Sequence, residues 1–454
     1  VTACGCATAN RIPLLVLPGD TFACRQPDPV LQQAEFFDNY GRTVTDAFKG
    51  VCHYFDRIIR PEQLMTACLN AMRVLTDPAD TGAVCLAMPQ DVEGEAYDYP
   101  EHFLQKRVWH IDRRPVSASQ LDRATQMIKA AKKPIIVCGG GVRYSSAEKE
   151  LQALAEKYNI PVSETQAGKG LIAWNHPLNL GGIGVTGGKA ANVIGRDADL
   201  VIGVGTRFTD FTTSSKWLFN EDRKVLGINI CPFDAYKMDA QAIVADAKET
   251  LTALIESLDG YKTAYTTEIA DAKKEWDAIV DEYYSTELEG GLNQTLALGI
   301  INEFMSEGDI ALGSAGSLPG DMQRLFRPNG TRTYHMEYGY SNMGYEVNGA
   351  LGAKLAKPEA EVYTFCGDGS FLMGHSELYT AIQEGLKINV CLFDNLGWGC
   401  IENLQNNQGT DTFGTVFRAR NPKTGMLDGG EIAVDFAKIA EGYGAKAYTI
   451  HTSA

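Results

Sequence analysis

The sequence predicts an α/β protein made of three consecutive parallel-sheet domains, the first and the last of them truncated. Apolar runs of strand length alternate with segments of helical spacing along the chain. Glycine-rich turns follow several of these runs, and two charged stretches divide the chain into three parts. We therefore expect domains at residues 1–105, 116–260 and 291–454.

The composition restricts the partners of this protein. The 454 residues carry a formal net charge of −16, with an isoelectric point of about 5.0. Such an acidic chain argues against nucleic acid or an anionic membrane as a partner. The 11 cysteines lack the spacing of metal ligands, which favours buried free thiols in a cytoplasmic protein. No apolar stretch reaches the length of a membrane span.

The first domain is expected to begin within a fold, because Val1 leads directly into Ala-rich helical sequence. Apolar runs predict strands at residues 12–17 and 82–89. A helix is expected from Pro61 to about Leu75, since proline suits a first helical turn. The acidic stretch at residues 93–103 is interpreted as a linker.

The second domain repeats the alternation of strands and helices. Strands are expected at residues 134–138, 160–162, 200–207 and 225–230, and helices at 117–131, 147–158 and 247–258. The glycines at 139–141, 203 and 205 do not complete a dinucleotide-binding pattern, so we expect a scaffold domain without a cofactor. Residues 261–290 are charged and predict a solvated connecting helix.

The third domain contains the most informative pattern. Apolar runs at residues 362–366 and 388–393 flank a helical segment at 377–382, and a helix is also expected at 348–355. The first run ends in the turn Gly367-Asp368-Gly369-Ser370, and the second ends in Asp394-Asn395-Leu396-Gly397. In a parallel sheet both turns would lie at the carboxyl ends of strands, where ligands bind. The chain ends at Ala454, just after another apolar run, which suggests that this domain is cut as well.

Two side chains in these turns are suited to a metal. Asp368 offers a carboxylate, and Asn395, 27 positions later, offers an amide oxygen; Gly397 could add its carbonyl. Such oxygen ligands suit Mg²⁺, which shares them with ligand phosphates. Gly369 permits backbone N–H groups to approach a phosphate. The alternative is that Gly-Asp-Gly is an ordinary turn.

The paired turns resemble the diphosphate–Mg²⁺ motif of thiamine diphosphate (ThDP) enzymes, although Asp394 replaces the first residue of the usual Asn pair. The resemblance implies ThDP and Mg²⁺ as cofactors, with the metal held by Asp368, Asn395 and Gly397. It also places Met343 beneath the bent cofactor and Trp398 beside it; the alternatives are that Met343 fills the core and that Trp398 merely packs. The implied cofactor-binding residues are Ala315, Gly316, Ser317, Met343, Gly367, Asp368, Gly369, Ser370, Asn395, Gly397 and Trp398.

The resemblance also assigns a role to each domain. Residues 1–105 would be the later part of a pyrimidine-binding domain, 116–260 a central Rossmann-like domain, and 291–454 the diphosphate- and Mg²⁺-binding domain. In this family a Glu early in the first domain activates the cofactor, and we expect that segment to lie outside the chain. The glutamates that remain there do not suit the role; they are Glu35, Glu62, Glu93 and Glu95.

Longer segments are similar to one branch of the family, whose members open a ring in myo-inositol catabolism. They are residues 20–33, 90–98, 164–169, 316–321, 334–341 and 413–418. The similarity implies hydrolytic C–C cleavage of a small polyhydroxylated cyclic dione to 5-deoxyglucuronate by a homodimer or higher homo-oligomer. Alternatives are an acetolactate synthase-like lyase, or a non-catalytic fragment that binds a nucleotide or a partner.

Isolated polar residues are weaker candidates. His53, His110, His335 and His375 suit a surface or a core as well as a site, and His335 lies nearest to the predicted cofactor loop. Arg25 could bind the substrate or stabilise its own loop.

Overall fold

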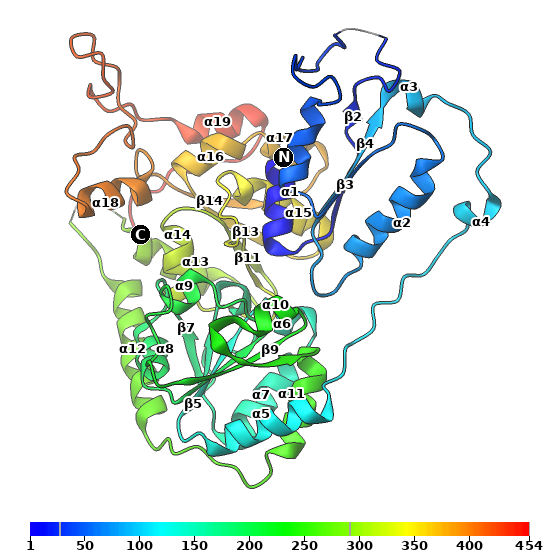
Figure 1. The fold of residues 1–454 in the computed structure, drawn as a ribbon. Coiled ribbons are helices and arrows are strands. Elements are labelled where there is room, and N and C mark those ends of the chain that lie inside the picture. Colours follow the sequence, from blue (N-terminus) through cyan, green and yellow to red (C-terminus); the bar gives the residue numbers. More distant parts are fainter. Residues whose placement is uncertain (27–28, 290–291, 454) are drawn as a thin grey trace. The chain divides into compact units, whose positions relative to one another are not determined.

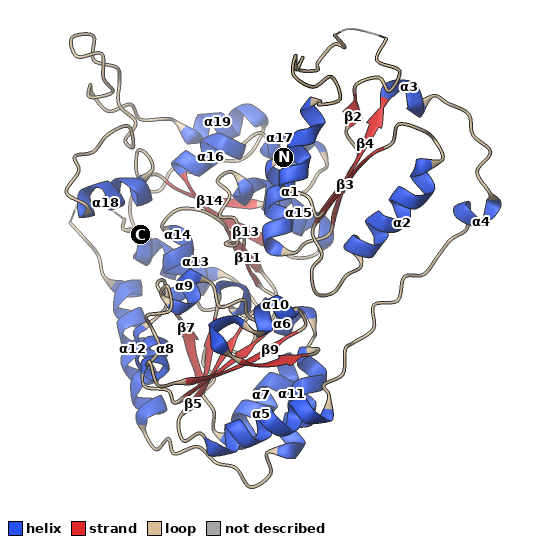
Figure 2. Cartoon of the chain, viewed as in Figure 1, coloured by secondary structure: helices blue, strands red, loops and turns tan. Residues whose placement is uncertain are grey.

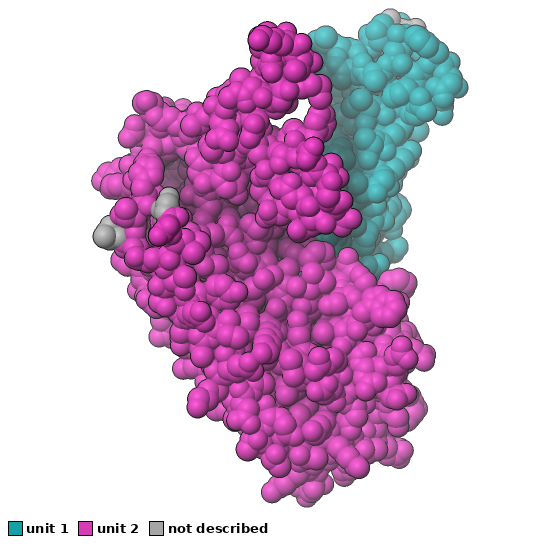
Figure 3. Space-filling model, turned by 90° about the vertical axis from the view of Figure 1, so that its left-hand side faces the viewer, with its two compact units in different colours: residues 1–113, 339–341 teal, residues 114–338, 342–454 magenta. Residues whose placement is uncertain are grey.

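The computed structural model describes residues 1–26, 29–289 and 292–453. Its strands form three sheets whose paired strands are parallel, as the sequence predicted (Figures 1 and 2). Residues 1–113 with 339–341 form one compact unit, and residues 114–338 with 342–454 form the other (Figure 3). The second unit contains two of the three sheets, so the predicted boundary between the second and third domains stays a prediction.

The first unit is built around strand β4, Ala83–Pro89, which is almost wholly buried. It pairs with β1 (Leu14–Val16), β2 (Gly19–Asp20) and β3 (Tyr54–Arg57). Helix α2 begins at Gln63, so Pro61 precedes the helix instead of opening it. The helices of this unit are α1 (Thr2–Asn10), the 3₁₀ helix η1 (Val44–Gly50), α2 (Gln63–Leu75), α3 (Gln90–Glu93) and α4 (Glu101–Leu104).

The second sheet has six strands in the order β10-β9-β8-β5-β6-β7. The first strand, β5, lies in the middle of the sheet. Strands β6 and β7 extend the sheet on one side of it, and β8, β9 and β10 extend it on the other, which is the strand order of a doubly wound dinucleotide fold. Helices α5, α7 and α11 cover one face, and α8 packs with α12 on the other (Figure 1). The strands are β5 (Pro134–Cys138), β6 (Val162–Glu164), β7 (Asn179–Gly182), β8 (Leu200–Val204), β9 (Lys224–Asn229) and β10 (Gln241–Val244). The helices are α5 (Ala118–Ala130), α6 (Gly140–Tyr144), α7 (Glu148–Tyr158), η2 (Gln166–Gly168), α8 (Lys189–Arg196), α9 (Asp210–Thr213), α10 (Pro232–Ala235), η3 (Lys237–Asp239) and α11 (Ala247–Ser257).

Glycines at the reversal point of this sheet serve close backbone packing. The Gly141 N–H donates to the Gly205 carbonyl at 3.0 Å, and the Gly139 N–H donates to that of Val204. A Cβ atom on Gly139 would lie 2.5 Å from the Gly205 oxygen. Two chain segments therefore meet in the crevice where such folds usually admit a nucleotide.

The third sheet has the order β12-β11-β13-β14. Its strands are β11 (Ile310–Gly313), β12 (Tyr334–Met336), β13 (Val362–Gly367) and β14 (Asn389–Phe393). The predicted connecting helix over 261–290 is shorter, with α12 at Glu268–Ser285, and residue 290 lies outside the described residues. The other helices are α13 (Gln294–Phe304), α14 (Leu318–Leu325), α15 (Tyr345–Ala356), α16 (Asp368–Gly374), α17 (Glu377–Gln383), α18 (Gly399–Asn407) and α19 (Phe436–Tyr443).

Two expectations for this region were wrong in detail. The glycine-rich turn after β13 is in fact the first turn of α16, since Asp368 is already helical. The helix expected from residue 348 starts earlier, at Tyr345.

The cysteines carry no disulfide. All 11 are free thiols. Six are buried, but Cys52, Cys68, Cys391 and Cys400 are partly exposed and Cys24 is exposed, so the prediction of burial was right for only part of the set. In the described part of the chain no helix is both long and apolar enough to cross a membrane.

Candidate cofactor site

The register of two neighbouring strands brings the two predicted turns together. Strands β13 and β14 are parallel, and Gly367 is opposite Phe393. The next residues, Asp368 and Asp394, therefore leave the sheet side by side at its carboxyl edge. This is the arrangement that the spacing of the two turns predicted.

The Asp368 carboxylate organises the second turn. It is fully buried, and its Oδ2 accepts hydrogen bonds from the Gly397 N–H at 2.9 Å and the Asn395 N–H at 3.2 Å. Its Oδ1 accepts the Gly369 N–H at 2.7 Å. Burial, together with the hydrogen-bonded Asp394 carboxyl, raises the pKa of Asp368 to about 6, although the N–H donors of Gly369 and Gly397 oppose the shift. Two adjacent carboxyl groups of this kind suit a divalent cation that neutralises both.

Glycines in these turns are required by close contacts. A Cβ atom on Gly369 would lie 2.6 Å from the Trp398 Nε1 atom. Gly397 has a φ of 159°, and a Cβ atom there would lie 2.1 Å from the Thr415 carbonyl oxygen. Open space surrounds Gly316 and Gly367, where a Cβ atom would meet no atom within 4 Å. The two turns thus combine tight packing with uncovered backbone, which fits an anionic group beside the metal.

Trp398 is positioned by the segment that follows. Its N–H donates to the Thr415 carbonyl at 2.8 Å, and its ring meets that of Phe417 edge-on at 5.1 Å. Gly397 also forms an antiparallel bridge with Val416. Segment 413–418 therefore packs against the turn that follows β14.

The remaining predicted residues lie on loops at the same edge of the sheet. Ala315 follows β11, Met343 precedes α15, and Ser370 belongs to the first turn of α16. A residue that the sequence analysis did not single out joins them: the Glu346 carboxylate accepts hydrogen bonds from Ala315, Gly344 and Ser370. Met343 itself is half-buried.

Of the four candidate histidines, His335 and His375 pack against neighbouring aromatic side chains. His335 lies on β12, and its Nε2 is 2.8 Å from the Tyr345 hydroxyl; burial lowers the pKa of His335 to about 4. His375 stacks on Phe371, and its Nδ1 is 3.0 Å from the Tyr443 hydroxyl. His53 approaches the Asp80 carbonyl in the first unit, and His110 is exposed.

The first unit contains an ionic network that the sequence analysis missed. The Arg57 guanidinium, at the end of β3, binds Asp20 at 2.5 Å and Asp46 at 2.8 Å. Thr43 and Thr45 complete the network by further hydrogen bonds. No local signal could reveal it, because Arg57 and Asp20 are 37 positions apart.

The other candidates of this unit have limited structural support. Arg25 is exposed and has a left-handed backbone, with a φ of 54°. Glu35, Glu93 and Glu95 are exposed, and Glu62 pairs with Arg60 at 2.9 Å. The expectation that the activating Glu lies outside the chain stays a prediction.

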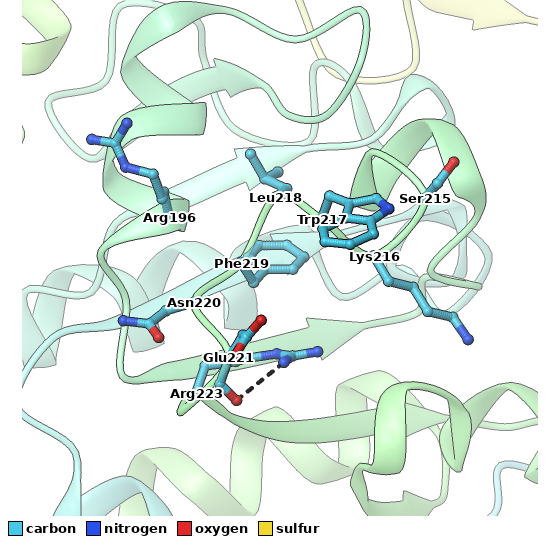
Figure 4. Close-up of a pocket in the computed structure, with 9 residues that line it drawn as sticks. All are labelled: Arg196, Ser215, Lys216, Trp217, Leu218, Phe219, Asn220, Glu221 and Arg223. Atoms are coloured by element: carbon cyan, nitrogen blue, oxygen red, sulfur yellow. Dashed lines mark hydrogen bonds between the residues drawn. The ribbon is translucent and has the colours of Figure 1, made fainter.

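A pocket of about 440 Å³ is lined by residues of the second sheet's domain, and none of the lining residues belongs to these turns (Figure 4). It is formed mainly by the segment between α9 and β9, which enters β9 at its amino end. The carboxyl ends of β5 and β8 lie at the opposite edge of this parallel sheet. Its lining residues are Arg196, Ser215, Lys216, Trp217, Leu218, Phe219, Asn220, Glu221 and Arg223.

Over the described ranges, no three His, Cys, Asp or Glu side chains gather into a metal site, so a cation at Asp368 would need amide and backbone oxygens as well.

Comparisons with known proteins agree with this geometry. Residues 121–254 match the family described as "Thiamine pyrophosphate enzyme, central domain", and residues 314–454 match "Thiamine pyrophosphate enzyme, C-terminal TPP binding domain". The chain is 54% identical to proteins named 3D-(3,5/4)-trihydroxycyclohexane-1,2-dione hydrolase from Clostridium tetani and Geobacillus thermodenitrificans. Each alignment covers 100% of this chain and 74% of the relative. The chain therefore belongs to the thiamine diphosphate-dependent enzyme family.

Proposed function

We propose that this protein is a ThDP- and Mg²⁺-dependent hydrolase of myo-inositol degradation. It would open the ring of 3D-(3,5/4)-trihydroxycyclohexane-1,2-dione to 5-deoxy-D-glucuronate. The observation that carries the proposal is 54% identity along the whole chain to hydrolases of that name. The C–C bond between the two carbonyl carbons breaks and one water molecule is consumed. One of these carbons becomes the carboxylate, and the other takes up a proton and becomes the aldehyde of the product.

The residues of the third sheet fit the cofactor. The Asp368 carboxylate, the Asn395 amide oxygen and the Gly397 carbonyl would hold Mg²⁺. The open space at Gly367, beside the turn that contains Gly369, would receive the diphosphate. When bound, ThDP supplies a nucleophilic carbon and an electron sink for C–C cleavage. The chain itself would bind, orient and partly enclose the reactants.

The loops before α14 and α15 would border the reacting end of the cofactor. Ala315, Gly316 and Ser317 would contact it from one side, and Met343 would support its bend from below. Trp398 would close the metal turn, since its ring packs on Phe417 and against Gly369. Water access at this edge would then be set by these loops.

Assembly and location complete the proposal. ThDP sites of this family are shared between subunits, so a homodimer or higher homo-oligomer is expected, and light scattering after size-exclusion chromatography measures it. A cytoplasmic location agrees with the 11 free thiols.

The decisive experiment combines binding and turnover. Calorimetry should show ThDP binding that depends on Mg²⁺, and incubation with the cyclic dione should yield 5-deoxy-D-glucuronate. Pyruvate serves as the control substrate. Turnover of pyruvate with no product from the dione would instead indicate a lyase of the acetolactate synthase kind and refute the proposal.

A further inference from the structure

A buried carboxylate in the third sheet connects three loops. Glu346 is 1% exposed, and its Oε1 accepts the Ala315 N–H at 3.1 Å. Its Oε2 accepts the Ser370 hydroxyl at 2.6 Å and the Gly344 N–H at 3.1 Å. The Ser370 Oγ also accepts the Gly344 N–H, at 2.8 Å. One side chain therefore fixes the loop after β11, the loop before α15 and the first turn of α16.

The local sequence explains how Glu346 reaches these loops. Gly344 adopts a left-handed conformation, with a φ of 84°, and α15 begins at the next residue. Glu346 lies in the first helical turn, where side chains lean back toward the preceding loop and the helix dipole favours an anion. The helix is anchored in turn, because the Thr364 hydroxyl of β13 donates to the Glu346 carbonyl at 2.9 Å.

Each loop held by this carboxylate carries a residue that we assign to the cofactor. Ala315 is one of them, Gly344 directly follows Met343, and Ser370 shares the first turn of α16 with Asp368. We propose that Glu346 is a positioning residue that holds the metal–diphosphate turn and the Met343 loop at a fixed separation. The inference rests on the proposed function, since the assignment of these loops to ThDP does.

The proposal predicts a specific ligand dependence. In Glu346→Gln the amide NH₂ faces either the Ala315 N–H or the Gly344 N–H, so one backbone donor loses its carboxylate acceptor and the loops are held less firmly. ThDP must contact both the metal turn and the Met343 loop, whereas inorganic pyrophosphate with Mg²⁺ needs the metal turn alone. Loosening of the loops should therefore weaken ThDP far more than pyrophosphate.

The experiment compares both ligands by calorimetry at saturating Mg²⁺ on the unsubstituted protein and on Glu346→Gln. Glu346→Asp, which keeps the charge but reaches less far, is measured beside it in case the first variant folds poorly. Glu164→Gln is the matched control, because Glu164 is 2% exposed and accepts the Gly170 N–H at 3.0 Å in the second sheet, away from these loops.

We expect the Kd of ThDP to rise at least tenfold in both Glu346 variants, while that of pyrophosphate changes less than twofold. The control should bind both ligands as the unsubstituted protein does. Equal weakening of both ligands, or unchanged ThDP affinity, would overturn the role of Glu346 while leaving the proposed function intact. Failure of the unsubstituted protein to bind ThDP would instead overturn the proposed function, and this inference with it.

Discussion

The substitution Asp368→Asn should change the stability of the cofactor-free protein little, but should remove most of the stabilisation that cofactor binding provides. Without metal, the asparagine oxygen can still accept the N–H groups of Asn395 and Gly397, while its amide faces the Gly369 N–H. That lost bond costs about 1–3 kcal/mol. Removal of a buried charge beside Asp394 offsets it, because that neighbour and burial raise the pKa of Asp368 to about 6. The free energy of unfolding should therefore change by no more than about 1 kcal/mol.

The same substitution, Asp368→Asn, should strongly weaken cofactor binding. Residues that only support metal ligands are worth about 10–100-fold in affinity, so replacing a charged ligand by an amide should cost at least about 100-fold. With ThDP at 100 times its Kd, binding stabilises the unsubstituted protein by about 2.7 kcal/mol, against about 0.4 kcal/mol after a 100-fold loss.

Urea denaturation with and without Mg²⁺ and ThDP measures both quantities. Asp321→Asn is the control, since Asp321 is a partly buried carboxyl on α14 that accepts a hydrogen bond from Gln294 at 2.5 Å. It should keep the full stabilisation by cofactor. If Asp368→Asn retained that stabilisation, the assignment of the metal to this turn would be wrong.

Three further substitutions test other parts of the structure. Arg57→Met should lower the free energy of unfolding by about 3–5 kcal/mol in urea titrations, because it leaves the buried Asp20 carboxylate without its cation; a decrease below 1 kcal/mol would contradict this. Gly139→Ala should destabilise the protein through the 2.5 Å approach to the Gly205 oxygen while leaving ThDP affinity unchanged once folded, and unaltered thermal stability would show that the crevice is open. His335 has a folded pKa of about 4, below the usual value of 6.5, so its contribution to stability is complete above pH 6.5 and is lost as the pH falls toward 4. The unsubstituted protein should therefore lose up to about 1.4 kcal/mol per pH unit more than His335→Gln across that window, and parallel pH profiles would refute the burial of a neutral imidazole.

The sequence predicted the parts of the fold that have long apolar runs. Strands β5, β8, β13 and β14 are five or six residues of mostly apolar character, and the glycine turns beside them mark where they end. The missed strands are short or polar: β3 ends in Asp56-Arg57, and β7 reads Asn-Leu-Gly-Gly. These segments are strands because they pair with buried neighbouring strands. The local sequence pattern does not contain this tertiary effect, so it could not predict them.

The same distinction applies to the site. Asp368 and Asn395 were predictable because one helix and one strand separate them, so parallel pairing must bring them together. Outside the site, helix α13 was also predictable from the sequence, because Asn is a favoured N-cap residue. The Asn293 side chain accepts a hydrogen bond from the Leu296 N–H and so caps the helix. Glu346 was not predictable, because its partners Ala315 and Ser370 lie 31 and 24 positions away and no motif connects them.

The place of β14 in the third sheet has a consequence for assembly of the holoenzyme. Within the described residues β14 is the last strand of the order, and none of its five residues is fully buried. Among the described strands β14 pairs with β13 alone, so separation of these two strands is the local opening that amide exchange in β14 would report. A cation shared by the turns after β13 and β14 would join these strands at their ends and slow that opening. Amide exchange in β14 should therefore be slower in the cofactor-loaded protein than in the free protein, and its rate would report cofactor loading.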